Sequence, residues 1–292
     1  MGTTTRALMF ALAALLGVLA LPAATVEASS PSGIGRMTVT PTIVTAGSTN
    51  NELTFTFVAD SSSLKGQTIV DFPRGWTFPQ RTNAAAPGHV ELRRGTCGRA
   101  TKIASVKVRR ITITTSCGRR QSFELLFHKA TAPEIAADGY IFLARTRSSK
   151  AGKKAKFKPL GRRKQPIVKV RGGPASSLFV GVTSVATVGV PFGVTVRAVD
   201  AYGNNAYPYA GTSASLKSSD PKATLPGAYT YVQTDAAQHV FDGVIMRTAG
   251  KQTVTATDSK GLTMQSTSID VLPSSGASSY LAFAASLAAS AA

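Results

Sequence analysis

Apolar and polar residues alternate with a period of two along much of the chain. In NELTFTFVAD, the apolar residues Leu53, Phe55 and Phe57 alternate with polar ones, and Val194 and Val196 do the same in VTVRAVD. Successive side chains of a β-strand point to opposite faces, so this period predicts strands with one buried face. Residues 33–143 show no amphipathic helical pattern. The sequence therefore predicts an all-β fold.

The first half of the chain contains seven or eight such short segments. They include RMTVTPTIV, GQTIVDFP, KIASVKV, RRITITTS, QSFELLFHKA and GYIFLART. Short strands separated by turn residues are typical of a β-sandwich, which we place at residues 33–144. Pro73 and Pro79 flank Trp76 in FPRGWTFPQ. Because proline cannot donate to a strand ladder, we expect Trp76 outside the strands, covering one end of the sandwich.

The N-terminus has the pattern of a secretory signal peptide. Arg6 supplies a positive charge, Ala7 to Leu21 form an apolar run, and the small residues of VEA precede Ser29. We predict that residues 1–28 are removed and that the protein is extracellular or at the cell surface. An uncleaved membrane anchor is the alternative. The apolar run is shorter than the ~20 residues that span a bilayer.

The chain has two cysteines, Cys97 and Cys117. With an export signal, two cysteines predict one disulfide in an oxidising compartment. Closing a loop of this length stabilises the folded state by about 3 kcal/mol in the chain-entropy description. A metal-binding or redox pair is the alternative. It is disfavoured by the wide spacing and by the absence of a nearby histidine.

Positive charge is concentrated in the first part of the chain. The formal net charge is +19, yet residues 175–292 contain six basic and six acidic side chains. The densest stretch, Arg145 to Arg171, has twelve basic residues and no acidic one. Such self-repulsion predicts an extended linker over residues 145–174, with its end, KQPIVKVR, as a candidate last strand of the first domain. Gly172, Gly173 and Pro174 then mark the domain boundary.

Two interpretations of this basic stretch remain open. It is either a solvated linker or a surface that binds a polyanion such as an anionic cell-wall polymer or an acidic polysaccharide. Specific nucleic-acid recognition is not expected, because Phe157 is the only aromatic residue among these cations. The candidate polyanion-binding residues are Lys153, Lys154, Lys156, Lys158, Arg162, Arg163 and Lys164.

The second half begins with a strand that ends in a turn, VTVRAVDAYGNN. Asp200, Gly203 and Asn204 are the expected structural residues of this turn, since Gly accepts positive φ and Asx side chains bond nearby amides. From Ala175 to Pro273 the chain resembles a bacterial immunoglobulin-like extracellular repeat. The resemblance rests on VDAYGNN, YAGTSASLKSSDPKATLP, YTYVQTDAAQHVFDGV and TAGKQTVTATD, in that order. It implies a fold and a surface location, and it brings no catalytic residues.

The motifs MTVTPTIVTAGS, ELTFTF and VDFPRGWTFPQ resemble, more loosely, an N-terminal β module of exported bacterial proteins. Together the two resemblances imply two consecutive immunoglobulin-like β-sandwich domains after the signal peptide, the second at residues 175–273. In the tail, 274–292, SGASSYLAF is similar to GPASSLFV at Gly173. This similarity either marks the start of a further repeat or arises by chance.

No catalytic, cofactor-binding or metal-binding residue stands out. Asp235 lies four residues before His239, about 13 Å along a strand, too far to orient it as a triad acid does. Asp and Asn at turns do not reach the six to eight oxygens that calcium takes. We therefore expect a non-enzymatic, exported bacterial protein that acts as a structural or adhesive module. Polyanion binding through residues 145–171 is the alternative, and the oligomeric state is left open.

Overall fold

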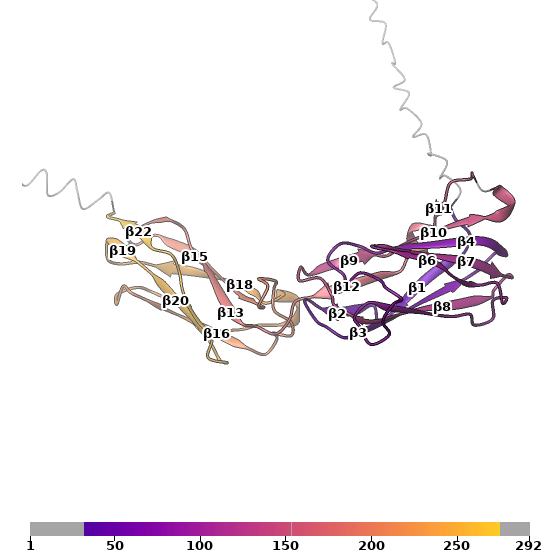
Figure 1. Ribbon diagram of the computed structural model, residues 1–292. Coiled ribbons are helices and arrows are strands. Elements are labelled where there is room, and N and C mark those ends of the chain that lie inside the picture. The colour runs from indigo at the N-terminus through magenta and orange to yellow at the C-terminus, as the bar shows by residue number, and fades with distance from the viewer. Residues whose placement is uncertain (1–31, 153, 275–292) are drawn as a thin grey trace, which may run out of the picture. The chain divides into compact units, whose positions relative to one another are not determined.

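The computed structural model describes residues 32–152 and 154–274, and these residues form two β-sandwiches (Figure 1). The first is drawn in indigo to magenta and the second in orange to yellow. No helix among the described residues is long and apolar enough to cross a membrane. The predicted signal peptide, residues 1–28, and residues 275–292 of the predicted tail lie outside the described residues.

The first sandwich packs two main sheets face to face. One sheet has the order β1 (Arg36–Thr40), β3 (Asn51–Val58), β8 (Ser122–Ala130), β5 (His89–Arg93). The other has the order β11 (Lys158–Pro159), β10 (Leu143–Ser148), β4 (Leu64–Asp71), β7 (Arg110–Cys117), β6 (Lys102–Lys107). A smaller sheet has the order β2 (Ile43–Thr45), β12 (Ile167–Arg171), β9 (Ala137–Ile141). Strands β5 and β6 are thus edge strands of the two main sheets.

The predicted alternation defines the core of this sandwich. Leu53, Phe55 and Phe57 of β3 are buried, as the period of two predicts, and face buried partners on β8. The rings of Phe57 and Phe123 stack with centroids 5.0 Å apart. Trp76 lies outside the strands, as the flanking prolines predict, and its ring packs edge-on against Phe142. It is only 4% exposed, so it completes the core as well as covering it.

The second sandwich is built from shorter sheets. Their orders are β13 (Ser177–Gly181), β15 (Pro191–Val199), β18 (Gln238–Ile245); β14 (Val185–Thr187), β22 (Ile269–Leu272), β19 (Gly250–Gln252); and β17 (Tyr229–Thr230), β16 (Ser213–Ser218), β20 (Val254–Asp258), β21 (Thr263–Gln265). Its core includes Val194 and Val196 of β15, the face that the alternation predicts, together with Tyr231 and Phe241.

Both sandwiches begin and end in the same way. The first strand, β1 or β13, pairs antiparallel with the next long strand, β3 or β15. The chain then crosses to a different sheet of the same sandwich, where β2 or β14 pairs in parallel with the last strand, β12 or β22. Two packed sheets of mainly antiparallel strands, about a hundred residues to each sandwich, are an immunoglobulin-like arrangement. The fold is therefore all-β, with two consecutive immunoglobulin-like sandwiches.

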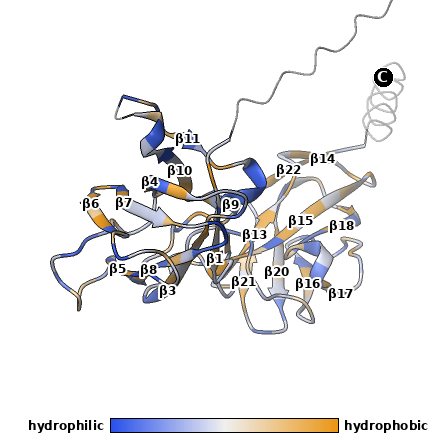
Figure 2. Ribbon diagram, turned by 90° about the vertical axis from the view of Figure 1, so that its right-hand side faces the viewer, coloured by the Kyte–Doolittle hydropathy of each residue, from blue (hydrophilic) through white to orange (hydrophobic). Residues whose placement is uncertain are grey.

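The basic stretch 145–171 differs from the expected linker, because both of its ends and a short middle segment form strands of the first sandwich. Strand β10 pairs with β4 through Arg145, and Lys158 of β11 pairs back onto Thr146 of β10. Leu160 is buried, as are the apolar residues of β12. The end of the stretch forms the last strand, in agreement with the alternative for KQPIVKVR. Between β10 and β11 the described chain carries the short 3₁₀ turn η1 (Ser149–Ala151), and much of this connection has the blue of hydrophilic residues in Figure 2.

Candidate functional site

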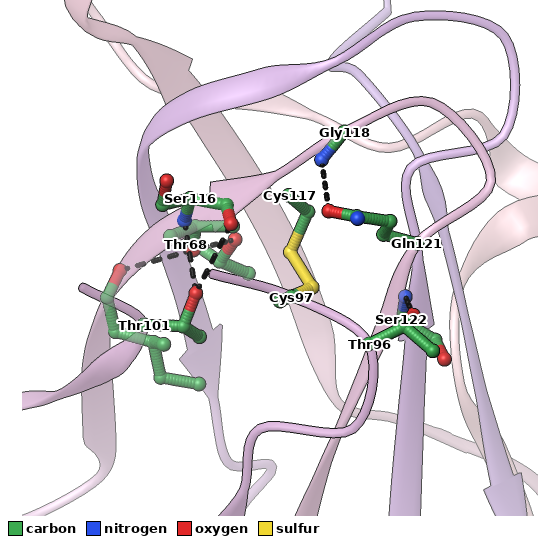
Figure 3. The surroundings of a disulfide bond; sticks show 11 residues. Thr68, Thr96, Cys97, Thr101, Ser116, Cys117, Gly118, Gln121 and Ser122 are labelled. Atoms are coloured by element: carbon green, nitrogen blue, oxygen red, sulfur yellow. Dashed lines mark hydrogen bonds between the residues drawn. A yellow bond between two sulfur atoms is a disulfide. The ribbon is translucent and has the colours of Figure 1, made fainter. Parts of the chain in front are cut away.

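The predicted disulfide between Cys97 and Cys117 is present (Figure 3), with the two Cα atoms 4.4 Å apart. It joins the connection between β5 and β6 to the end of β7. The Gly98 N–H donates to the carbonyl of Ser116 (2.7 Å), and the Ser116 N–H donates to Oγ1 of Thr101 (3.0 Å). The disulfide and these bonds hold the connection against the sheet edge.

The predicted polyanion-binding residues lie on the irregular part of the basic stretch and on β11. All those that the structure describes are exposed, and Arg162, Arg163 and Lys164 form the 3₁₀ turn η2 (Arg162–Lys164). Lys164 Nζ contacts Asp60 Oδ2 at 2.8 Å, and this hydrogen bond lowers the pKa of Asp60. Lys153 lies outside the described residues. The exposed cations of this group that form no ion pair with a described acidic residue are Lys154, Lys156, Lys158, Arg162 and Arg163.

The turn after β15 is organised by the buried carboxylate of Asp200. Its Oδ1 accepts the N–H groups of Tyr202 and Asn204, each at 2.9 Å, and its Oδ2 accepts the Gly173 N–H at 2.8 Å. Burial favours the neutral acid, but these bonds and one from the Asn204 side chain outweigh it and lower the pKa of Asp200. Gly203 has φ of +82°, which glycine adopts without strain. The carboxylate is thus occupied by the backbone of its own turn, by the Gly173 N–H and by the side chain of Asn204.

Other titratable side chains in the second sandwich are also engaged in packing. The Tyr209 hydroxyl donates to Asp258 Oδ2 at 2.7 Å, and burial together with this carboxylate raises the pKa of Tyr209. The ring of His239 stacks on Tyr229 with centroids 3.4 Å apart. Within residues 32–152 and 154–274, no group of three or more His, Cys, Asp or Glu side chains is placed to hold a metal ion. These contacts give the side chains structural roles.

A cationic groove that the sequence did not single out lies between the edge strands β5 and β6. It has a volume of ≈ 770 Å³. Its cations, Arg81, Arg94, Arg99 and Lys102, come from three separate segments of the chain. The count of basic residues outside 145–171 signals a charged surface, but only the pairing of the strands brings these four together. We call this site the β5–β6 groove.

No family model matches the chain, and no curated protein matches it. Solved structures that are similar to it include InvD of Yersinia pseudotuberculosis, with 13% identity, a TM-score of 0.41, and coverage of 82% of this chain and 58% of that one. Invasin, a bacterial integrin-binding protein, has 13% identity and a TM-score of 0.33, over 84% and 42%. A putative membrane-anchored protein of Corynebacterium diphtheriae has 11% identity and a TM-score of 0.28, over 82% and 54%.

The chain thus spans about half the length of these three solved chains.

Proposed function

We propose that this chain is an exported bacterial protein that acts at the cell surface, or after secretion, as a non-enzymatic structural or adhesive module. The observation that carries the proposal is a pair of consecutive immunoglobulin-like sandwiches, the first closed by the disulfide between Cys97 and Cys117. Disulfides persist in oxidising compartments outside the cytosol. Sandwich folds support this role because their loops vary while the two-sheet core stays intact.

Export is tested by expressing the full chain in a bacterial host and fractionating the cells. We expect the protein in the surface or secreted fraction, with Ser29 as its first residue and both cysteines oxidised, as read by intact mass.

Adhesion is tested by comparing how expressing and non-expressing cells attach to glycan-coated glass. Retention in the cytosol with residues 1–28 intact and free thiols would contradict the proposal.

The alternative function, polyanion binding through residues 145–171, has its own supporting observation. Lys154, Lys156 and Lys158 are exposed and take part in no ion pair with a described acidic residue. The test replaces all seven candidate cations, from Lys153 to Lys164, with glutamine. Earlier salt elution of this variant from an anionic cell-wall preparation would support the alternative, and unchanged elution would end it.

A further inference from the structure

The β5–β6 groove lies where the two main sheets of the first sandwich leave an open side. Strand β5 ends the sheet β1-β3-β8-β5, and β6 ends the sheet β11-β10-β4-β7-β6. Residues His89 to Leu92 of β5 and Lys102 to Ala104 of β6 line opposite walls. Its volume is ≈ 770 Å³.

Four cations face this groove with their charge uncompensated. Arg81, Arg94, Arg99 and Lys102 are exposed, and none forms an ion pair with an acidic side chain of the described chain. One carboxylate, that of Glu91, also lines the groove. Four positive charges around one negative charge make a site for an anion, and low-dielectric walls on two sides concentrate the field there.

The backbone that carries Arg94 and Arg99 is held in place by covalent and hydrogen bonds. The disulfide (Figure 3) fastens Cys97 to the end of β7. The Cys97 N–H donates to the Arg94 carbonyl at 3.0 Å. On the far side of Arg99, the Thr101 N–H donates to the Gly98 carbonyl at 2.9 Å. A loop already ordered in the free protein loses less entropy when a ligand binds.

The segment that carries Arg81 is joined to β5 by backbone hydrogen bonds of the preceding residue, Gln80. The Gln80 N–H donates to the Gly88 carbonyl at 2.8 Å, and the Val90 N–H donates to the Gln80 carbonyl at 2.9 Å. The Gln80 side chain also donates to the Asn83 carbonyl at 2.7 Å, which closes the turn that follows. The residue before Arg81 is thus tied to the outer edge of β5.

The lining selects among anionic ligands. None of its residues is Phe, Tyr or Trp, and its one imidazole ring, that of His89, already stacks on His128 with ring centroids 5.8 Å apart, so the groove is poor in the stacking platforms that single-stranded nucleic acids use. The negative charge of Glu91 repels a continuous row of phosphates, whereas its oxygens accept hydrogen bonds from hydroxyl groups. Arginine pairs well with carboxylate and sulfate oxygens, because its planar fork donates two hydrogen bonds at once.

From this combination we infer that the β5–β6 groove binds a linear acidic polysaccharide, with its carboxylate or sulfate groups on the four cations and its hydroxyls near Glu91. The inference deepens the proposed function by giving the adhesive module a ligand class. The exposed cations of residues 150–164 then add attraction for any polyanion, without discrimination.

The test measures the affinity of the purified protein for a heparin octasaccharide and for single-stranded DNA of equal formal charge. The groove variant carries Arg81→Gln, Arg94→Gln, Arg99→Gln and Lys102→Gln. The matched control carries Lys150→Gln, Lys154→Gln, Lys156→Gln and Arg162→Gln, which removes the same charge from exposed positions. The wild type is expected to bind the octasaccharide at least tenfold more tightly than the DNA. The groove variant is expected to lose this preference, and the control to bind both ligands more weakly while keeping it.

A second variant, Cys97→Ser with Cys117→Ser, keeps all four cations but releases the connection that carries two of them. Its octasaccharide affinity is expected to fall about three- to tenfold, with Trp76 fluorescence confirming that the core is intact. Equal affinity of the wild type for the two ligands, tighter binding of DNA, or loss of preference in both glutamine variants would overturn the inference. These results concern the purified protein, so they are independent of the export and cell-attachment results that test the proposed function.

Discussion

At the residue scale, buried carboxylates hold the loops of the second sandwich. Asp220 is 2% exposed. Its Oδ2 accepts hydrogen bonds from the backbone N–H groups of Arg247 (2.6 Å) and Thr248 (2.9 Å). Its Oδ1 accepts one from the Lys222 N–H (3.0 Å). Burial favours the neutral form, but these bonds and one from the Thr248 hydroxyl outweigh it and lower the pKa of Asp220. The loops before and after this carboxylate therefore depend on its negative charge.

The substitution Asp220→Asn tests this dependence. The asparagine NH₂ group would face N–H donors, so we expect the second sandwich to lose about 2 kcal/mol of its free energy of unfolding. Asp242→Asn is the matched control, because the Asp242 side chain is exposed and forms no hydrogen bond or ion pair within the described part of the chain. It should change the free energy of unfolding by less than about 0.5 kcal/mol. Urea unfolding followed by near-ultraviolet circular dichroism measures both.

The same pair of proteins gives a pH dependence with a definite sign. A carboxyl whose pKa is lower in the folded than in the unfolded state contributes its full stability above the unfolded value, about 3.9. That contribution disappears as the pH falls through the folded-state pKa. The stability difference between wild type and Asp220→Asn should thus be constant from pH 7 to 5 and shrink below pH 4. A difference that stays the same down to pH 2.5 would contradict the role given to the charge.

At the scale of elements, the basic stretch 145–171 is part of a packed sandwich. The Leu160 N–H donates to the carbonyl of Ala144, and the Gln165 side chain donates to the carbonyls of Leu160 and Ala144. The side chain of Leu160 is 3% exposed and belongs to the core that includes Phe142. An apolar contact and several hydrogen bonds thus hold this end of the stretch, although its surface is strongly basic.

The substitution Leu160→Ala tests whether the stretch 145–171 is packed against the core or is a free linker. A packed leucine should cost about 2–4 kcal/mol when truncated, since its buried area and its volume are both lost. The control is Val108→Ala, at a position 66% exposed, where we expect less than about 0.5 kcal/mol. Trp76 fluorescence during urea unfolding reports the stability of the first sandwich. Equal, small effects of the two substitutions would show that residues 145–171 are not fastened to the core.

At the scale of the whole molecule, the two sandwiches have separate cores and separate spectroscopic probes. The only tryptophan, Trp76, is in the first core, whereas of the seven tyrosines only Tyr140 lies before residue 175. Tyr209 and Tyr231 pack edge-on in the second core with centroids 4.9 Å apart. Unfolding of each sandwich can therefore be followed in the intact chain.

The variant Cys97→Ser with Cys117→Ser should destabilise one sandwich and spare the other. Its cysteines are 20 residues apart, and opening a loop of that size costs about 3 kcal/mol. The midpoint followed by Trp76 should fall by roughly 10 °C, while the tyrosine-monitored midpoint stays within about 1 °C. A common shift of both midpoints would mean that the two sandwiches unfold as one unit.

The sequence by itself determined the strands and the disulfide. Alternation such as that of Leu53, Phe55 and Phe57 is a local pattern, and the side-chain geometry of a strand turns it directly into one buried face. Two cysteines allow only one pairing. The turn at Asp200 was also readable, because Asx and glycine residues act on the backbone within a few positions.

Only the tertiary structure decided where the positive charge lies. Net charge indicated a linker in residues 145–174, but β10 pairs with β4, some 75 residues away, and that pairing is not a local property. The β5–β6 groove likewise depends on which strands become sheet edges and on the disulfide that holds Arg94 and Arg99 beside them. Composition counts charges along the chain, whereas a site needs them at neighbouring points in space, and long-range strand pairing is what places them there.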